Sequence, residues 1–298
     1  MVTVISSQQR KEFSKTIMEL VQQRYSCRTY QAQMLENETR QKLEKFLAGL
    51  YPGPLGSITR FALIAASESD RKALKSLGTY GFIKAAPGFI VGACKPGKFN
   101  LEDYGYQLEL SVLFATELGL GTCWLGGTFT KSSFARKIAV KEDELVPAVA
   151  SVGYIAEKPR MIESFLGKGK GNRKRLPWEN LFFDRGFFHP LSPESAGNFL
   201  DTLYMVRLSP SASNRQPWRL VKDHRAWHFY LQRTPGYRES PLVRWTTIAD
   251  LQRIDLGIAM CHFELGSHAS GCEGSWEHND PMIELPDSLT EYIVSWSY

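Results

Sequence analysis

Two arginines and a serine alternate near the start of this 298-residue chain, at Arg24, Ser26 and Arg28. In an extended backbone alternate side chains point to the same side, so these three groups would share one face. An arginine presents a planar fork of donors to phosphate oxygens, and a serine hydroxyl adds one more hydrogen bond. The spacing therefore predicts a phosphate clamp, although a solvated basic loop shows the same pattern. Arg173 and Arg175 repeat the alternation in a later basic, glycine-rich run.

A second polar stretch runs from Pro210 to Trp218. Its two prolines fix φ and remove backbone donors. Between them stand side chains that both donate and accept hydrogen bonds, namely Ser211, Ser213, Asn214 and Gln216. This composition predicts a stiff loop that can bond the edge of a flat heterocycle. An ordinary turn uses the same residue types, so the local pattern leaves both interpretations open.

The run from Gly119 to Gly127 is rich in glycine but matches neither the dinucleotide-binding pattern nor the Walker pattern. Glycine lets a backbone approach a planar ligand closely and direct amide groups at it. Glycine also ends helices, so a helix end at Gly119 followed by a tight turn is the plainer interpretation. Both interpretations predict a loop in this run.

Hydrophobic periodicity and capping residues predict mixed helices and strands around these motifs. We expect helices at about 9–24, from a cap at Asn37 to Leu50, at 103–118, at 131–139, from Ser192 and Pro193 to about 206, and at 248–266. We expect strands at 60–66, 88–93, 148–155, 218–222 and 227–232.

The order of helix, proline-containing loop and strand occurs twice, which indicates an internal duplication. Asp103-Tyr-Gly105 and Asp255-Leu-Gly257 lie 152 residues apart (255 − 103), and the same offset relates Gly119 to Gly271 and Trp124 to Trp276. We therefore expect an α+β chain with two halves, 1–183 and 184–298.

Three motifs together resemble the nitroreductase family of FMN-dependent oxidoreductases. They are Arg-Tyr-Ser-Cys-Arg-Thr-Tyr at 24–30, Gly-Leu-Gly-Thr-Cys-Trp-Leu-Gly-Gly at 119–127 and Pro-Ser-Ala-Ser-Asn-Arg-Gln-Pro-Trp at 210–218. The resemblance covers most of the chain, from about residue 15 to the end. In the family the third motif normally follows the first by a few tens of residues. Here it lies in the second half, and its first-half counterpart, Pro52 to Thr59, lacks the Asn and Gln.

Family members are typically intertwined homodimers with FMN at the subunit interface, so the resemblance implies a fused chain that forms this dimer within itself. Such a chain can bind one FMN as a monomer. The mirror site would need a phosphate clamp near Asp184-Arg-Gly-Phe-Phe-His189, where no serine or second arginine stands in place. By the resemblance, the FMN would contact Arg24, Tyr25, Ser26, Arg28, Trp124, Leu125, Gly126, Gly127, Arg173, Arg175, Pro210, Ser211, Ala212, Ser213, Asn214 and Gln216.

The resemblance also assigns roles within that set. The arginines and Ser26 would hold the phosphate and ribityl chain, and the polar side chains from Ser211 to Asn214 would bond the isoalloxazine edge or ribityl hydroxyls. Backbone amides near Gly126 and Gly127 would approach the flavin N5. Many relatives have an acidic residue where Gly126 stands.

The implied activity is that of an FMN-dependent oxidoreductase. A hydride from NAD(P)H would pass to the flavin N5 and then to an electron-poor acceptor such as a nitroaromatic or a quinone. This chemistry requires no protein nucleophile, and we assign no catalytic residue. The alternative is a non-catalytic relative, flavin-binding or flavin-free, with a role in storage, sensing or interaction.

Composition favours a soluble cytoplasmic protein and no membrane or nucleic-acid partner. The five cysteines contain no CxxC pair, which argues for a reducing compartment. The first ten residues lack a signal-peptide pattern, and no apolar run reaches the length of a membrane span. The net charge of +5 is mild, and no aromatic residues are interleaved with the basic run for base stacking. The cluster Cys261, His262, His268, Cys272 and His278 could suggest zinc, but we expect no metal because 248–266 has the pattern of a core helix.

Overall fold

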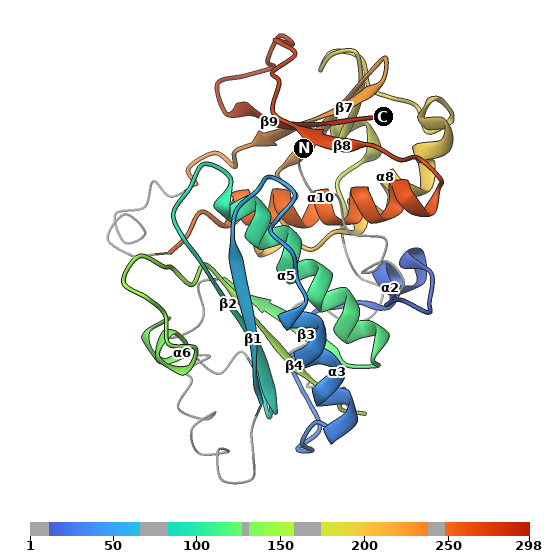
Figure 1. Cartoon of the computed structure of the whole chain (residues 1–298). Helices are drawn as coiled ribbons and strands as arrows, with labels where there is room; N and C mark the ends of the chain where they lie inside the picture. The colour runs from blue at the N-terminus through green and yellow to red at the C-terminus, as the bar shows by residue number, and fades with distance from the viewer. Residues whose placement is uncertain (1–11, 66–82, 127–130, 158–173, 238–247) are drawn as a thin grey trace.

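The computed structural model describes residues 12–65, 83–126, 131–157, 174–237 and 248–298. Two β-sheets enclose a layer of crossing helices (Figure 1). The helices α5 (Asn100–Glu117) and α10 (Leu251–Ala269) lie at the centre, and most of the buried apolar side chains of both sheets pack on this layer. The chain is therefore α+β, as the sequence predicts.

The first sheet has the strand order β1-β2-β4-β3, and all its pairs are antiparallel. Its strands are β1 (Thr59–Ala65), β2 (Gly88–Cys94), β3 (Gly121–Leu125) and β4 (Val149–Gly153). The prediction of a loop throughout 119–127 is wrong, because residues 121–125 form β3 and pair with β4. The glycine at 119 follows the preceding helix with a φ of 77°, so the chain turns there before β3 begins.

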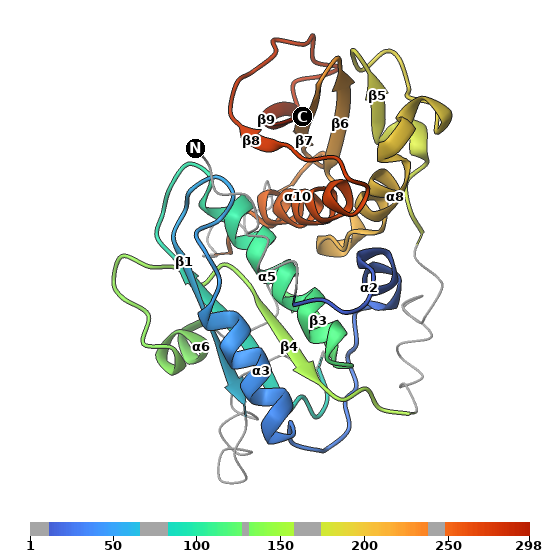
Figure 2. The ribbon, with the colours of Figure 1, turned by 45° about the vertical axis from the view of Figure 1, so that its right-hand side comes forward.

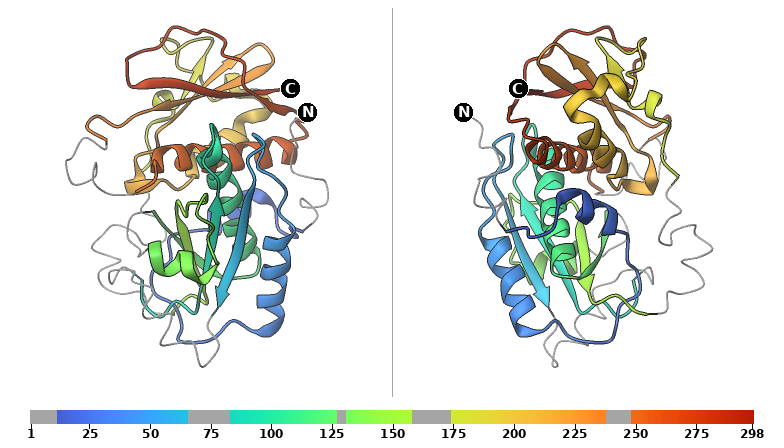
Figure 3. Two further views of the ribbon diagram at one scale, coloured as in Figure 1. Left: turned by 60° about the vertical axis from the view of Figure 1, so that its left-hand side comes forward. Right: turned by 90° about the vertical axis from the view of Figure 1, so that its right-hand side faces the viewer.

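In the described residues, the helices that accompany this sheet are α2 (Ile17–Gln23), α3 (Asn37–Ala48), α5 and α6 (Lys131–Lys137). Helix α2 begins at residue 17 and not near residue 9, because Thr16 and Glu19 form a capping box. Asn37 is the first residue of α3 and does not cap it, since its Oδ1 accepts a hydrogen bond from Arg40. Helices α3 and α5 lie on one side of the sheet, and α6 lies on the other (Figure 3).

The second sheet has the order β5-β6-β7-β9-β8. Its strands are β5 (Phe182–Asp184), β6 (Trp218–Asp223), β7 (Ala226–Gln232), β8 (Ser275–Glu277) and β9 (Thr290–Ser297). The strands at 218–223 and 226–232 are predicted, whereas β5, β8 and β9 are not. Without β5, which pairs in parallel with β6, the remaining strands repeat the connectivity of the first sheet.

The expected helix after Ser192 is divided into two parts. The 3-10 helix η3 (Glu194–Phe199) comes first, and α8 (Leu200–Leu208) follows it. Gly197 causes the break, because it has a φ of 59° and a ψ of −132° inside η3. Two further 3-10 turns are η2 (Trp178–Asn180) and η4 (Ala212–Asn214).

Helices α5 and α10 cross in close contact at the centre of the molecule (Figure 2). A Cβ on Gly105 of α5 would overlap the carbonyl oxygen of Ile254, and a Cβ on Gly257 of α10 would overlap that of Glu102. The contact is reciprocal, because each glycine meets the residue three positions before the other glycine. Glycine is therefore required at both positions for the backbones to approach this closely.

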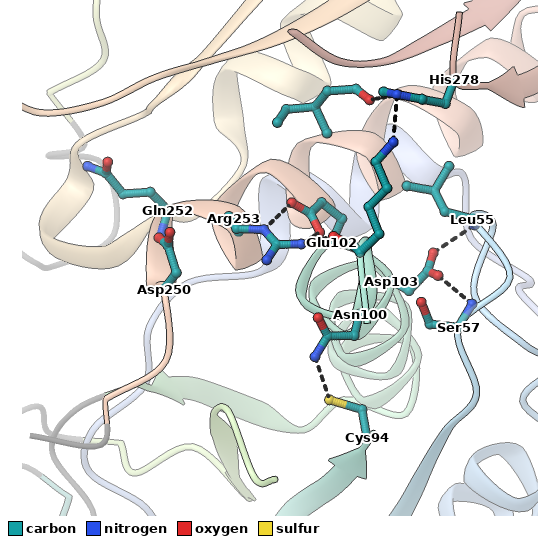
Figure 4. A network of polar contacts seen from close by, with 12 residues as sticks. Leu55, Ser57, Cys94, Asn100, Glu102, Asp103, Asp250, Gln252, Arg253 and His278 are labelled. Atoms are coloured by element: carbon teal, nitrogen blue, oxygen red, sulfur yellow. Dashed lines mark hydrogen bonds and ion pairs between the residues drawn. The ribbon is translucent and has the colours of Figure 1, made fainter. Parts of the chain in front are cut away.

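Buried charges interrupt the apolar surface of α5, including Glu102, Asp103 and Glu109. Arg253 on α10 makes a bidentate contact with Glu102, with nitrogen–oxygen distances of 2.7 and 2.6 Å (Figure 4). None of the helices in the described ranges is both long and apolar enough to span a bilayer.

A carboxylate near the start of each central helix holds the loop that precedes a strand. Asp103 accepts hydrogen bonds from the backbone amides of Leu55 and Ser57 at 2.8 and 2.7 Å (Figure 4). Asp255, which lies 152 residues later, accepts from the backbone amide of Ala212 with both oxygens, at 2.9 and 3.1 Å. The two loops at 52–57 and 210–216 are thus fixed to the central layer in the same way.

The Asp103 contact predicts a pH-dependent stability. Burial raises the pKa of Asp103 from 3.8 to about 6, although the amides of Leu55 and Ser57 act in the opposite direction. The folded state therefore holds this proton more tightly than the unfolded state. The contribution of Asp103 to the unfolding free energy should fall by about 3 kcal/mol between about pH 4 and about pH 7.

Urea unfolding of the wild type and of Asp103→Asn across this pH range measures the contribution. The unfolding free energy of the wild type, relative to that of the variant, should decrease as the pH rises, because asparagine does not titrate. A difference between the two proteins that is constant with pH would contradict the assignment.

Candidate functional site

A cavity of about 350 Å³ lies between β3, the 210–213 loop and the start of α10. Both halves of the sequence contribute to its wall. The lining residues are Ser26, Arg28, Cys123, Trp124, Leu125, Gly126, Ala148, Pro210, Ser211, Ala212, Ser213, Leu251, Ile254, Asp255 and Ile258. The structure thus brings together residues from all three motifs.

Ser26 and Arg28 reach the cavity because the segment after α2 runs beside β3. Ser26 forms a parallel β-bridge with Thr122, and the amide of Cys27 donates to the Thr122 carbonyl at 2.8 Å. The Arg28 guanidinium donates to the carbonyl of Ser26 at 3.1 Å. One cation and one hydroxyl therefore stand at the same end of the cavity.

Arg24 and Tyr25 do not line this cavity. They line a second one, of about 850 Å³, beside α2 and the start of β3. Arg24 is 3% exposed, and its Nε lies 3.7 Å from Glu109 Oε1 in the core. The expectation that Arg24, Ser26 and Arg28 share one face is therefore wrong. The reason is that Arg24 is the C-cap of α2, where the chain leaves the helix, and its side chain is paired with the buried Glu109.

The 210–216 loop presents Ser211, Ala212 and Ser213 to the cavity. Three of its non-glycine residues have positive φ: Ser213 at 50°, Asn214 at 57° and Gln216 at 52°. Such backbone conformations are uncommon and persist where the surroundings hold them, often at ligand sites. Asp255 holds this loop through Ala212, and burial raises the pKa of Asp255 well above its ordinary value.

Asn214 and Gln216 point away from the cavity and hold the 174–176 segment. The Asn214 side-chain amide donates to the Lys174 carbonyl at 2.7 Å, and Gln216 Oε1 accepts from the amide of Leu176 at 3.0 Å. Gln216 is 2% exposed. In this structure both side chains stabilise the shape of the loop.

Arg175 also contacts the back of the loop. Its guanidinium donates to the carbonyls of Leu208 and Ser209 at 2.7 and 2.8 Å and to Asn214 Oδ1 at 3.1 Å. Arg173 and Gly127, which the sequence also assigns to the site, lie outside the described residues.

Gly126 and Leu251 meet in the wall of the cavity. A Cβ on Gly126 would stand 2.6 Å from Leu251 Cδ2 and 2.8 Å from Cδ1. The leucine therefore occupies the space next to the glycine. At this position the chain has an apolar contact.

Sequence reasoning missed the contribution of α10 to the wall. Leu251, Ile254, Asp255 and Ile258 recur at helical spacing on one face of this helix. The spacing could have identified the face, but the pattern is the same as that of a core-facing helix.

The cluster considered for zinc is dispersed. His262 contacts the Met205 carbonyl and Glu109, each at 2.9 Å, and His278 contacts the Ile293 carbonyl at 2.8 Å. In the part of the chain that the structure describes, no three His, Cys, Asp or Glu side chains are grouped as metal ligands.

The sequence matches a family model described as "Putative TM nitroreductase" over residues 16–267. A search of curated proteins found no significant match. Among solved structures, a putative nitroreductase from Thermotoga maritima has a TM-score of 0.60 and 19% identity, covering 95% of this chain and 94% of that chain. The likeness to this protein therefore extends over both sheets and establishes the fold.

Shorter nitroreductases match about half of the chain. An FMN-dependent nitroreductase from Clostridium difficile R20291 has 25% identity and a TM-score of 0.39, covering 47% of this chain and 88% of that one. A nitroreductase with bound FMN from Desulfitobacterium hafniense DCB-2 has 18% identity and a TM-score of 0.41, and the match covers 49% of this chain and 92% of that one. Because the family model spans most of its length, the chain belongs to the nitroreductase family that this model describes.

Proposed function

We propose that the chain binds one FMN in the 350 Å³ cavity and acts as an oxidoreductase. Its reductant would be NAD(P)H, and its acceptor would be an electron-poor molecule such as a nitroaromatic or a quinone. The observation that carries the proposal is the composition of the cavity wall. It joins a cation and three hydroxyls to broad apolar surfaces, and family membership supports the same cofactor.

The residues present fit the chemistry of FMN. Arg28 and Ser26 would hold the phosphate, because a guanidinium and a hydroxyl are strong partners for phosphate oxygens. Ser211 and Ser213 would bond polar edges of the cofactor. The apolar side chains from β3 and α10 would cover a flat ring, and the volume lies within the range of small-molecule sites.

The positions of Arg24, Asn214, Gln216 and Arg175 support indirect roles. Asn214, Gln216 and Arg175 would keep the 210–216 loop in its left-handed conformation. Arg24 would act through Glu109, which lies 3.7 Å from its Nε. For Arg173 and the backbone of Gly127 we propose the direct contacts with FMN that the resemblance implies.

Bound FMN would supply the hydride chemistry, accepting a hydride from NAD(P)H and passing it to the acceptor. The protein's part would be to bind, orient and exclude water. The apolar contact between Gly126 and Leu251 forms part of the cavity wall and brings no charge of its own.

We also propose that the two halves, 1–183 and 184–298, arose by duplication. The repeated strand order and the reciprocal glycine contacts of α5 and α10 support this proposal. The proposed boundary falls within β5, which joins the second sheet.

The mirror position is filled by side chains, which supports one FMN per chain. The offset of 152 relates Gly126 to His278 and Leu251 to Phe99. The His278 ring lies 5.1 Å from the Phe99 ring, and its Nε2 lies 2.8 Å from Lys98 Nζ. An imidazole thus stands where the proposed site has only a glycine.

Titration of the purified protein with FMN tests this function. We expect binding of one FMN per chain, seen by absorption and quenched flavin fluorescence, and loss of the flavin absorption on anaerobic addition of NADH or NADPH. Failure to take up FMN would overturn the proposal. Uptake without reduction by either nucleotide would favour the non-catalytic alternative.

A further inference from the structure

Glu109 lies fully buried in the middle of α5 and contacts groups on three other segments. Its Oε2 accepts a hydrogen bond from the Trp124 indole at 2.7 Å. Its Oε1 lies 2.9 Å from His262 Nε2 on α10 and 3.7 Å from Arg24 Nε at the end of α2. Trp124 is the member of this group that lines the 350 Å³ cavity.

The donor and acceptor properties of these groups determine where most of the protons lie. An indole N–H only donates, so Glu109 Oε2 must accept from Trp124. His262 Nδ1 lies 2.9 Å from the Met205 carbonyl, which only accepts, so this nitrogen carries a proton. One proton then lies between His262 Nε2 and Glu109 Oε1. The buried carboxyl group is thereby held from both sides.

A buried carboxylate is costly unless it is paired and hydrogen-bonded. Arg24 and His262 supply the compensating groups here, and both are buried. This accounts for the position of Arg24 in the core and away from Ser26 and Arg28. The carboxylate in turn holds the indole, whose ring forms part of the cavity wall.

We propose that Glu109 is a positioning residue that fixes the Trp124 indole as a wall of the FMN cavity, with Arg24 as its charge partner and His262 as its hydrogen-bond partner. This inference rests on the proposed function. Glu109 also joins Trp124 of the first half to His262 on α10 of the second half.

A second tryptophan–glutamate pair provides an internal control. Trp276 donates to Glu264 Oε2 at 2.6 Å, and both residues are buried. Trp276 packs in the core and does not line the cavity. Substitutions of this pair remove the same kind of hydrogen bond without touching the proposed FMN site.

The test combines Glu109→Gln and Trp124→Phe in a double-mutant cycle with FMN affinity as the readout. We expect Glu109→Gln to raise the Kd for FMN about tenfold, because the indole then donates to a neutral amide oxygen and the ionic contact with Arg24 is lost. In the Trp124→Phe background the same substitution should change the Kd less than about twofold. Glu264→Gln should leave the Kd unchanged.

Fluorine NMR of the FMN-free protein labelled with 5-fluorotryptophan gives a second readout. The Trp124 resonance, assigned by its absence in Trp124→Phe, should shift or broaden in Glu109→Gln and stay in place in Glu264→Gln. An unmoved resonance together with an unchanged Kd would overturn the inference.

Failure of the proposed FMN function can be distinguished from failure of the proposed role of Glu109. A wild type that binds no FMN would refute the proposed function, while the resonance would still test whether Glu109 holds Trp124. If Glu109→Gln does not fold, Trp124→Phe and Trp276→Phe carry the comparison. Equal FMN affinities of these two variants would then overturn the inference, and a selective loss in Trp124→Phe would support it.

Discussion

Replacing Arg28 by alanine is expected to weaken FMN binding by about 10- to 150-fold. Arg28 lines the cavity beside Ser26, and its guanidinium would make a charge-assisted contact with the phosphate. Such a contact contributes about 1.5–3 kcal/mol, which corresponds to this range of affinity. The loss should appear in a fluorescence titration with FMN, and riboflavin, which lacks the phosphate, should bind the variant and the wild type alike.

Arg185→Ala is the matched control for Arg28→Ala. It removes the same charge from the second half, where the Arg185 side chain is 73% exposed. We expect its FMN affinity to equal that of the wild type. If both variants bind FMN with wild-type affinity, Arg28 does not hold the phosphate.

Replacing Gly257 by alanine is expected to lower the free energy of unfolding by about 3 kcal/mol or more. The added Cβ would overlap the backbone carbonyl of Glu102, which belongs to another helix and cannot move independently. The two central helices would have to separate, which disturbs the apolar core that both sheets share. Urea unfolding followed by circular dichroism measures this loss.

Gly105→Ala should have a comparable effect, because its Cβ would overlap the carbonyl of Ile254. Gly97→Ala serves as the control, since the atom nearest to its Cβ would be Asn100 Cβ at 3.8 Å and the residue is exposed. Wild-type stability in both Gly105→Ala and Gly257→Ala would contradict the close crossing.

Much of the fold follows from the sequence because the pattern of buried residues is strong. The periodicity of α5 and α10 and the apolar run of β2 identify elements whose residues are almost all buried. The strand β3 was missed because the glycines of the 119–127 run also suit a loop, and only pairing with β4 decides between the two. The short strand β5 depends on β6 in the same way.

The site was predictable as a set of motifs, but the direction of individual side chains was not. Ser26, Arg28 and Ser211 line the same cavity. Arg24 does not, because Glu109 binds it in the core and no local pattern reveals a partner 85 residues away (109 − 24). Gln216 likewise contacts a segment that is distant in sequence, through Leu176.

The difference between Gly126 and His278 bears on how the two equivalent positions can evolve. In a symmetric assembly of identical subunits, one substitution alters every copy of a position. In this chain the two positions are encoded separately, so the imidazole at 278 leaves the glycine at 126 untouched. Because both walls of the cavity belong to one polypeptide, their association is also a first-order process. Dilution that would dissociate a two-subunit site should leave this one intact.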